Sequence, residues 1–343
     1  IQQAAWDALG DLQGAVIAIN PKTGAILAMV SKPTFDPNTL AGHDTDQVIA
    51  AYDQLLADPA GPLFNRTLPG NLNPPGSTFK LVVAAAALDS GQYTADSQFP
   101  NPPQLQLPQS DSVIINSGGD DCGGAPTVSI SDAIRLSCNI PFAELGQAIG
   151  TRAILAQAMK FGFNSSVSVP LESTPSVYPR ALDEPQTMLS AFGQSSVRAS
   201  PLQMAMVSMA IANGGTLMKP NLVESITAPN LTVLQSLEPS VYGQAMSRET
   251  AAAITQMMVG SVSNGAASNA RIDGVDVAGK TGTAENGEGD PYTLWFTGFA
   301  PANDPQVVVA VVVENGAGLG QSSYGNAIAA PIAKKVLEAV LFR

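Results

Sequence analysis

The chain has 343 residues, 45% of them hydrophobic and 13% charged, which is enough apolar material for one large domain with two lobes. Its formal net charge of −12 argues against nucleic acid as a partner, because phosphate binding requires a basic surface. The single histidine, His43, lies in a polar stretch typical of a solvated loop, which disfavours a Ser-His-Asp triad, and one histidine with two cysteines disfavours a zinc site.

The chain begins with a short helix and a β-hairpin. Residues 1–10 are expected to be the end of a linker helix that stops at Gly10 and follows a missing N-terminal region. Strands are predicted at residues 15–19 and 25–30, and the turn-forming residues between them make a hairpin. Residues 11–343 are then expected to form the functional domain.

Helical patterns dominate the middle of the chain, at about residues 128–265. A Pro-rich loop at residues 68–75 leads into an Ala-rich helix predicted at residues 77–88. Further helices are predicted at residues 151–161 and 201–213, the second starting on a proline and ending before two glycines.

The end of the chain has strand-like runs at residues 275–284, 292–300 and 306–313, which predict an antiparallel meander, followed by a last helix at Gly325–Leu341. Two strands at the start and three at the end imply a single sheet built from both ends of the chain. The predicted fold is α/β or α+β, with a five-stranded, largely antiparallel sheet covered by helices that also form a second lobe. Every apolar run is shorter than the roughly 18 residues of a membrane span, so a membrane anchor is expected only in the missing region.

The first candidate catalytic motif is Ser-Thr-Phe-Lys at residues 77–80, at the start of the Ala-rich helix. Residues three apart on a helix share one face, so the Lys80 amine can reach the Ser77 hydroxyl. Burial and neighbouring cations can lower the pKa of a lysine until it accepts a serine proton. A serine and a lysine on the protein surface would also explain the motif when it is taken alone. The preceding Pro-Pro-Gly and the apolar helix favour a buried site instead.

The second motif is Ser-Cys-Asn at residues 137–139, after the helical stretch Ile130–Leu136. A hydroxyl and an amide two residues apart on a loop can face one cleft. Ser137 is a candidate proton relay to a leaving group, and Asn139 is a candidate to hold Lys80 and a substrate amide. An ordinary polar helix end explains this tripeptide equally well when it is taken alone.

The third motif is Lys-Thr-Gly-Thr-Ala at residues 280–284, in a predicted strand where alternate side chains face opposite sides. Lys280 is expected to put a cation behind the site, and Gly282 to let the substrate backbone approach. The hydroxyls of Thr281 and Thr283 are expected to bind a substrate carboxylate. An ordinary glycine-containing strand is the competing explanation.

Two similar motifs are assigned to ordinary structure. The Lys-Thr-Gly at residues 22–24 belongs to the predicted hairpin turn. Residues 274–281 fit the pattern G-x-x-x-x-G-K-[ST], but a phosphate-binding loop needs a strand before it and a helix after it. A polar segment precedes this match and a turn follows it, so a nucleotide site is kept as a remote alternative.

Ser-x-x-Lys, Ser-x-Asn and Lys-Thr-Gly in this order resemble the shared signature of penicillin-binding proteins and serine β-lactamases. The resemblance covers nearly the whole chain and is strongest to class B penicillin-binding proteins, which are monofunctional transpeptidases. Beyond the motifs, it rests on residues 14–29, 65–66, 200–205 and 295–301.

The resemblance implies a penicillin-binding, serine β-lactamase-like fold and peptidoglycan D,D-transpeptidase activity. Ser77 would attack the D-Ala-D-Ala carbonyl of a stem peptide, with the backbone N–H groups of Ser77 and Thr283 as the oxyanion hole. An amine of a neighbouring stem would then resolve the acyl-enzyme. Also implied are inhibition by β-lactam antibiotics, no metal or organic cofactor, and other cell-wall synthesis or division proteins as partners. The expected location is the extracytoplasmic face of the bacterial membrane, reached only through the missing anchor.

The cysteines, Cys122 and Cys138, are expected to form a disulfide in an exported protein, with two free thiols as the alternative. Because Cys138 is the middle residue of Ser-x-Asn, the bond is expected to anchor the loop that carries Ser137 and Asn139.

A D,D-carboxypeptidase and a β-lactamase share these motifs and are kept as alternatives. Class A β-lactamases carry a Glu-x-x-x-Asn sequence between the second and third motifs. None of the glutamates in that interval is followed by Asn four residues on: Glu144, Glu172, Glu184, Glu224, Glu238 and Glu249. A β-lactam sensor is disfavoured because the sequence lacks a transmembrane signalling region, and a pseudoenzyme because all three motifs are intact.

Overall fold

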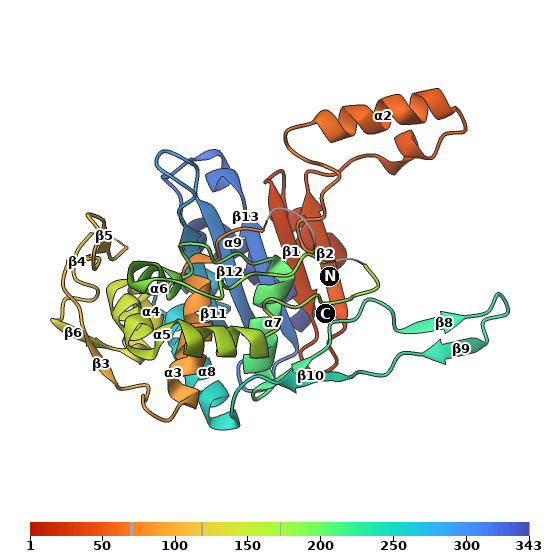
Figure 1. Ribbon diagram of the computed structural model, residues 1–343. Coiled ribbons are helices and arrows are strands. Elements are labelled where there is room, and N and C mark those ends of the chain that lie inside the picture. The colour runs from red at the N-terminus through yellow and green to blue at the C-terminus, as the bar shows by residue number, and fades with distance from the viewer. Residues whose placement is uncertain (69–71, 118, 172, 343) are drawn as a thin grey trace.

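The computed structural model describes residues 1–68, 72–117, 119–171 and 173–342 (Figure 1). Its centre is a five-stranded antiparallel sheet in the order β11-β12-β13-β1-β2. The strands are β1 (Gly14–Ile19), β2 (Ile26–Lys32), β11 (Ala278–Ala284), β12 (Thr293–Ala300) and β13 (Val307–Val313). Because β1 pairs with β13, both ends of the chain build one sheet, and the predicted fold class is confirmed.

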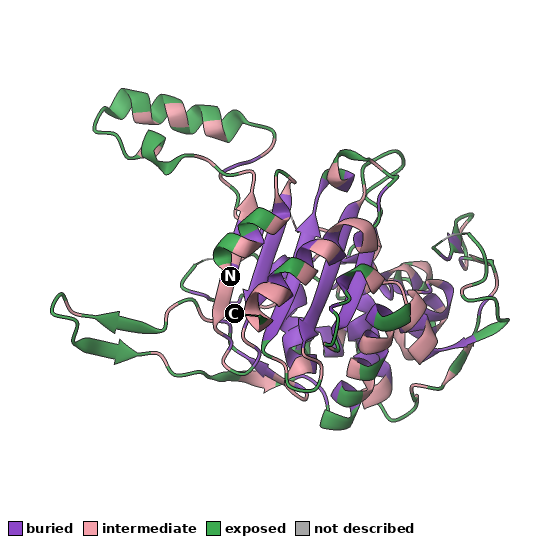
Figure 2. Cartoon of the chain, turned by 180° about the vertical axis from the view of Figure 1, so that it is seen from behind, coloured by how far each residue is buried: buried purple, intermediate pink, exposed green. Residues whose placement is uncertain are grey.

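Helices cover both faces of the sheet, which explains why β1, β12 and β13 are buried along their whole length. Alternate residues of β13 enter different cores. Val309 and Val311 pack with α1 (Gln2–Leu9) and α9 (Gly325–Leu341), which lie together on one face in Figure 2. Val308 and Val312 pack on the opposite side with the larger helical core.

The larger core joins the sheet to a helical lobe. Its elements are α3 (Lys80–Asp89), α4 (Ile130–Leu136), α5 (Ile140–Lys160), α6 (Glu184–Ser190), α7 (Pro201–Ala212) and α8 (Arg248–Asn264). α3 and α7 are buried almost all round, as expected of helices that are apolar on every side. The helix predicted at residues 151–161 is the second half of α5, which is interrupted at Gly150, where φ is 79°.

Several elements were missing from the predicted organisation. An exposed helix, α2 (Thr45–Ala57), and the short turn η1 (Pro37–Leu40) follow β2, and Figures 1 and 2 show this segment projecting from the body. Four short antiparallel ladders are also present: β3 (Gln98–Pro100) with β6 (Thr127–Ser129), β4 (Gln104–Gln106) with β5 (Val113–Ile115), β7 (Thr216–Met218) with β10 (Val241–Gln244), and β8 (Ser225–Thr227) with β9 (Val233–Ser236). Helices dominate residues 128–265 as predicted. The short strands were not predicted, because each is only three or four residues long and too short to show a period.

The Ala-rich helix begins as a 3-10 turn, η2 (Gly76–Phe79), before α3, and residues 69–71 of the Pro-rich loop lie outside the described residues. Further 3-10 turns are η3 (Ser268–Ala270) and η4 (Asn315–Gly318). His43 is exposed in the loop before α2. In the described part of the chain, every helix is too short or too polar to cross a membrane.

Candidate active site

Ser77 of the Ser-x-x-Lys motif lines a cavity of about 1020 Å3, at the junction of the sheet and the helical lobe. Ser77 is on η2 and is half-buried. The turn before it is held on two sides, because the indole of Trp295 donates to the Pro74 carbonyl at 2.9 Å and the Gly76 N–H donates to the Gly193 carbonyl at 3.0 Å. The sheet and the helical lobe together therefore fix the position of the nucleophile.

Lys80, on the first turn of α3, is fully buried. Its Nζ donates to the Ser137 carbonyl at 2.7 Å and to Asn139 Oδ1 at 2.8 Å. Burial, with a smaller contribution from the charge of Lys280, lowers the pKa of Lys80 well below its ordinary value. Among the described residues Ser77 Oγ has no hydrogen-bond partner, so the Ser77–Lys80 contact is not formed in this conformation. Such contacts often close only in the substrate complex.

Ser137 and Asn139 occupy the sharp turn between α4 and α5. Ser137 ends α4 in the left-handed conformation, with φ at 66°, and the chain then reverses direction into α5. The Asn139 side chain donates to the Ile115 carbonyl at 3.0 Å. The Asn139 and Ile140 N–H groups both donate to Asn116 Oδ1, at 2.9 and 3.1 Å. Asn116 is buried and supports the motif, and the sequence carries no local signal for it.

Lys280 on β11 completes the constellation. Its Nζ donates to Ser137 Oγ at 2.7 Å, between residues 143 positions apart in the chain. Lys280 is fully buried, and burial lowers its pKa to about 7. All three sequence motifs thus meet at one place through Ser137 and Asn139. The P-loop alternative is wrong, because the Gly-Lys-Thr of that match lies within β11 and no helix follows it.

Three other residues of β11, Thr281, Gly282 and Thr283, line the cavity, and the two threonine hydroxyls differ in their hydrogen bonds. The Thr281 hydroxyl donates to the Ala266 carbonyl at 2.9 Å, which uses its proton. Thr283 Oγ1 accepts from the Gly325 N–H at 3.1 Å, which leaves its own proton available to a ligand. A Cβ on Gly282 would lie 2.8 Å from the Pro75 carbonyl. The glycine is thus needed for close packing of β11 against the nucleophile turn, a role not anticipated from the sequence.

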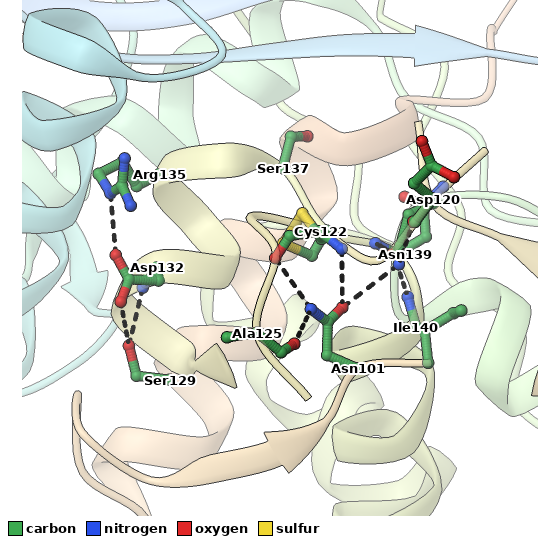
Figure 3. The surroundings of a disulfide bond; sticks show 12 residues. Asn101, Asp120, Cys122, Ala125, Ser129, Asp132, Arg135, Ser137, Asn139 and Ile140 are labelled. Carbon is green, nitrogen blue, oxygen red and sulfur yellow. Dashed lines mark hydrogen bonds and ion pairs between the residues drawn. A yellow bond between two sulfur atoms is a disulfide. The ribbon is translucent and has the colours of Figure 1, made fainter. Parts of the chain in front are cut away.

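Cys122 and Cys138 form a disulfide across a sequence separation of 16 residues, immediately beside Ser137 and Asn139 (Figure 3). The loop around Cys122 is held by Asn101, whose side chain donates to the carbonyls of Cys122 and Ala125 at 2.9 and 2.8 Å. The bond therefore ties the Ser-x-Asn turn to a loop that is fixed independently.

We expect the Cys122→Ala/Cys138→Ala double variant to lose about 3 kcal/mol of unfolding free energy, because the closed loop no longer restricts the unfolded chain. Acylation by a β-lactam should slow as well, since the turn carrying Asn139 gains freedom. Thermal melting and the rate of fluorescent penicillin labelling measure the two effects. A reducing agent should weaken the wild type and leave the double variant unchanged. Equal melting and labelling of the wild type and the variant would contradict this prediction.

Residues 14–338 match the family model described as the penicillin binding protein transpeptidase domain. The chain therefore belongs to this family, as a class B member. It is 42% identical, over 99% of its length, to the peptidoglycan D,D-transpeptidase PbpA of Mycolicibacterium smegmatis, of which it covers 70%. The structure of penicillin-binding protein A from M. tuberculosis in its ceftriaxone acyl-enzyme complex matches with a TM-score of 0.94 and 40% identity, over 99% of this chain and 77% of that one.

A D,D-transpeptidase domain from Eggerthella lenta matches with a TM-score of 0.88 and 35% identity, over 100% of this chain and 82% of that one. These findings confirm the resemblance to class B penicillin-binding proteins. They also confirm a narrower expectation from the sequence, its resemblance within this class to actinobacterial penicillin-binding protein A.

Proposed function

We propose that this chain is a peptidoglycan D,D-transpeptidase in which Ser77 is the nucleophile and Lys80 its general base. The observation that carries the proposal is the buried Lys80 amine, whose pKa is lowered, one helical turn from a serine that lines a large cavity. The amine is oriented by Asn139 and by the Ser137 carbonyl. A neutral amine in this position can take the Ser77 proton as the hydroxyl attacks a carbonyl carbon.

Each further residue of the site has a role in the proposed cycle. Backbone N–H groups of Ser77 and Thr283 hold the oxyanion, a contribution worth about 3–4 kcal/mol per donor in comparable enzymes. Ser137, hydrogen-bonded to Lys280, passes a proton to the departing D-Ala. The free proton of the Thr283 hydroxyl is directed to the terminal carboxylate of the stem peptide. An amine of a second stem then attacks the acyl carbon, the ester bond to Ser77 breaks, and the proton lost by the amine returns to the Ser77 oxygen through Lys80, which completes the cross-link.

A β-lactam enters the same cycle as a mimic of the D-Ala-D-Ala end, and the opened ring remains as an ester on Ser77. The substrate class places the reaction at the extracytoplasmic face of the bacterial membrane. We propose that the enzyme works there beside other cell-wall synthesis or division proteins, held by an anchor outside this sequence. The proposed chemistry uses side chains and backbone groups alone.

The class A β-lactamase alternative is disfavoured by the position of the glutamates between the second and third motifs. Of the described glutamates between the second and third motifs, none lines the cavity, and Glu172 lies outside the described residues. Glu144, whose pKa is raised by burial, is on α5 away from the cavity lining. Among the described residues, this interval therefore offers no cavity-lining glutamate to activate water for rapid deacylation.

Nitrocefin kinetics and product analysis test the proposal. A transpeptidase should give a single burst, stoichiometric with enzyme, and with a D-Ala-D-Ala donor it should transfer the acyl group to an added amine. Fast steady-state turnover of nitrocefin would instead identify a β-lactamase. Release of D-Ala with no aminolysis product at any amine concentration would identify a carboxypeptidase.

A further inference from the structure

Two charged side chains of opposite sign line the active-site cavity without a role in the cycle above. Of the described residues that line it, only Arg198 and Glu285 are charged at neutral pH. The two catalytic lysines are fully buried beneath the cavity and already hydrogen-bonded. In a chain with a net charge of −12, an arginine in the wall of a substrate cavity is a specific feature rather than part of a basic surface.

Arg198 is held in a fixed position close to the nucleophile turn. Its backbone pairs with Val177 at 2.7 and 2.9 Å, and the next residue, Ala199, pairs with Asn73 at 3.2 and 2.8 Å. Its Nη1 donates to the carbonyls of Ser195 and Val197 at 2.9 and 2.8 Å. The Nε and Nη2 donors have no protein acceptor among the described residues. The half-buried guanidinium therefore keeps part of its donor edge for a ligand.

Glu285 follows the last residue of β11, directly after the strand that carries Thr283. Its backbone is clamped by Gln194, whose carboxamide, with both polar atoms satisfied, accepts from the Glu285 N–H at 2.9 Å and donates to its carbonyl at 3.3 Å. Gln194 thus contacts Glu285, and its neighbour in the chain, Ser195, contacts Arg198. Neither charge forms an ion pair within the part of the chain that the structure describes.

We propose that Arg198 and Glu285 form a subsite for a free amino-acid end of the stem peptide, in which an ammonium and a carboxylate share one carbon. The guanidinium would bind the carboxylate, a pairing that its planar fork favours, and Glu285 would receive the ammonium. This inference rests on the proposed transpeptidase function, and it names the residues that would recognise one region of the substrate. The amino-acid end belongs either to the donor stem or to the attacking acceptor, and the test separates these sources.

The donor test uses Nα-acetyl-X-D-Ala-D-Ala, where the side chain of X ends in both charges (2,6-diaminopimelyl), ammonium alone (lysyl), carboxylate alone (2-aminopimelyl) or neither (norleucyl). If the donor occupies the subsite, loss of the carboxylate should lower wild-type kcat/KM about 10- to 100-fold, as expected for a hydrogen bond to a charged group. In Arg198→Gln, loss of the substrate carboxylate should lower kcat/KM by no more than about twofold, because the guanidinium that binds the carboxylate is already absent. Loss of the substrate ammonium should likewise lower kcat/KM of the wild type and have little effect on kcat/KM of Glu285→Gln.

The acceptor test uses the norleucyl donor, so that contacts of a charged donor side chain are excluded. The acyl-enzyme is offered D-alanine or D-alaninamide as the attacking amine. If the acceptor occupies the subsite, wild type should favour D-alanine about tenfold or more, and Arg198→Gln should remove this preference. A merely structural role of Arg198 would change the rates with both amines together and leave their ratio unaltered.

Arg152→Gln is the charge-matched control, because Arg152 is an exposed arginine of α5 outside the cavity lining. It should keep every wild-type ratio. A substrate ratio that differs between the wild type and Arg198→Gln or Glu285→Gln supports the subsite. The test in which the ratio differs shows whether the donor or the acceptor occupies it. The subsite is overturned if wild type, Arg198→Gln and Glu285→Gln show the same ratios in both tests. Failure of the wild type to turn over any donor, together with no penicillin adduct on Ser77, would instead show that the proposed function is wrong.

Discussion

Replacement of Ser77 by alanine is expected to abolish the covalent penicillin adduct, because the hydroxyl is the only atom proposed to attack. Lys80→Ala should leave the nucleophile in place and slow acylation by about 10²- to 10⁴-fold, the usual contribution of a general base. The reason is that the variant loses a fully buried amine that Ser137 and Asn139 orient beneath the cavity. Labelling with a fluorescent penicillin, read on a denaturing gel and as a time course, measures both effects.

The pH dependence of acylation follows from the Lys80 pKa. The base must be the neutral amine, so the rate should rise with pH as Lys80 loses its proton. Because burial and Lys280 lower this pKa, the rise should be complete well below the ordinary pKa of lysine. Lys280→Met removes the neighbouring cation and should move the midpoint to higher pH. A midpoint that stays in place would contradict the electrostatic link between the two lysines.

Matched controls separate chemistry from folding. Ser90→Ala removes a hydroxyl at the C-terminal end of α3, and Lys22→Ala removes the lysine of the Lys-Thr-Gly in the hairpin turn. Both variants should label at the wild-type rate. An undiminished adduct on Ser77→Ala would refute the assignment of the nucleophile.

Replacement of Arg66 by alanine is expected to lower the free energy of unfolding by about 3–5 kcal/mol, because it leaves a buried carboxylate without its cation. Arg66 Nε lies 2.9 Å from Glu314 Oε2, and the two side chains are only 3% and 8% exposed. Glu314 also accepts from Gln13 at 2.8 Å and from Asn73 at 3.1 Å. The pair thus joins the end of β13 to the segment that leads to the nucleophile.

Urea unfolding of a small set of variants tests this pair. Arg66→Met/Glu314→Met should lose less stability than the sum of its two single variants, since neither charge is left unpaired. The exposed pair Lys22–Asp304, with side chains 54% and 68% accessible, is the reference, and Lys22→Ala should change stability by no more than about 1 kcal/mol. If Arg66→Ala and Lys22→Ala have equally small effects, the buried pair does not hold the fold as inferred.

Helix α2 was not predicted, although its first residues carry a local signal for the start of a helix. Asp44 caps the helix by accepting from the N–H groups of Asp46 and Gln47, and the Gln47 side chain returns to Asp44. An Asp followed three residues later by Gln before an apolar run is a helix-start signature. The short exposed strands β8 and β9 carried no comparable signal, because they pair without burying a face.

The sequence by itself determined the parts that depend on local chemistry: the strands of the sheet, the last helix, and the three motifs with their family. The tertiary structure decided which distant groups meet. It placed Lys280 against Ser137, Asn116 beneath the Ser-x-Asn turn, and Arg198 in the same cavity as Glu285. The physical reason is that periodicity and turn chemistry act over a few residues, whereas contacts across the fold depend on the packing of whole elements.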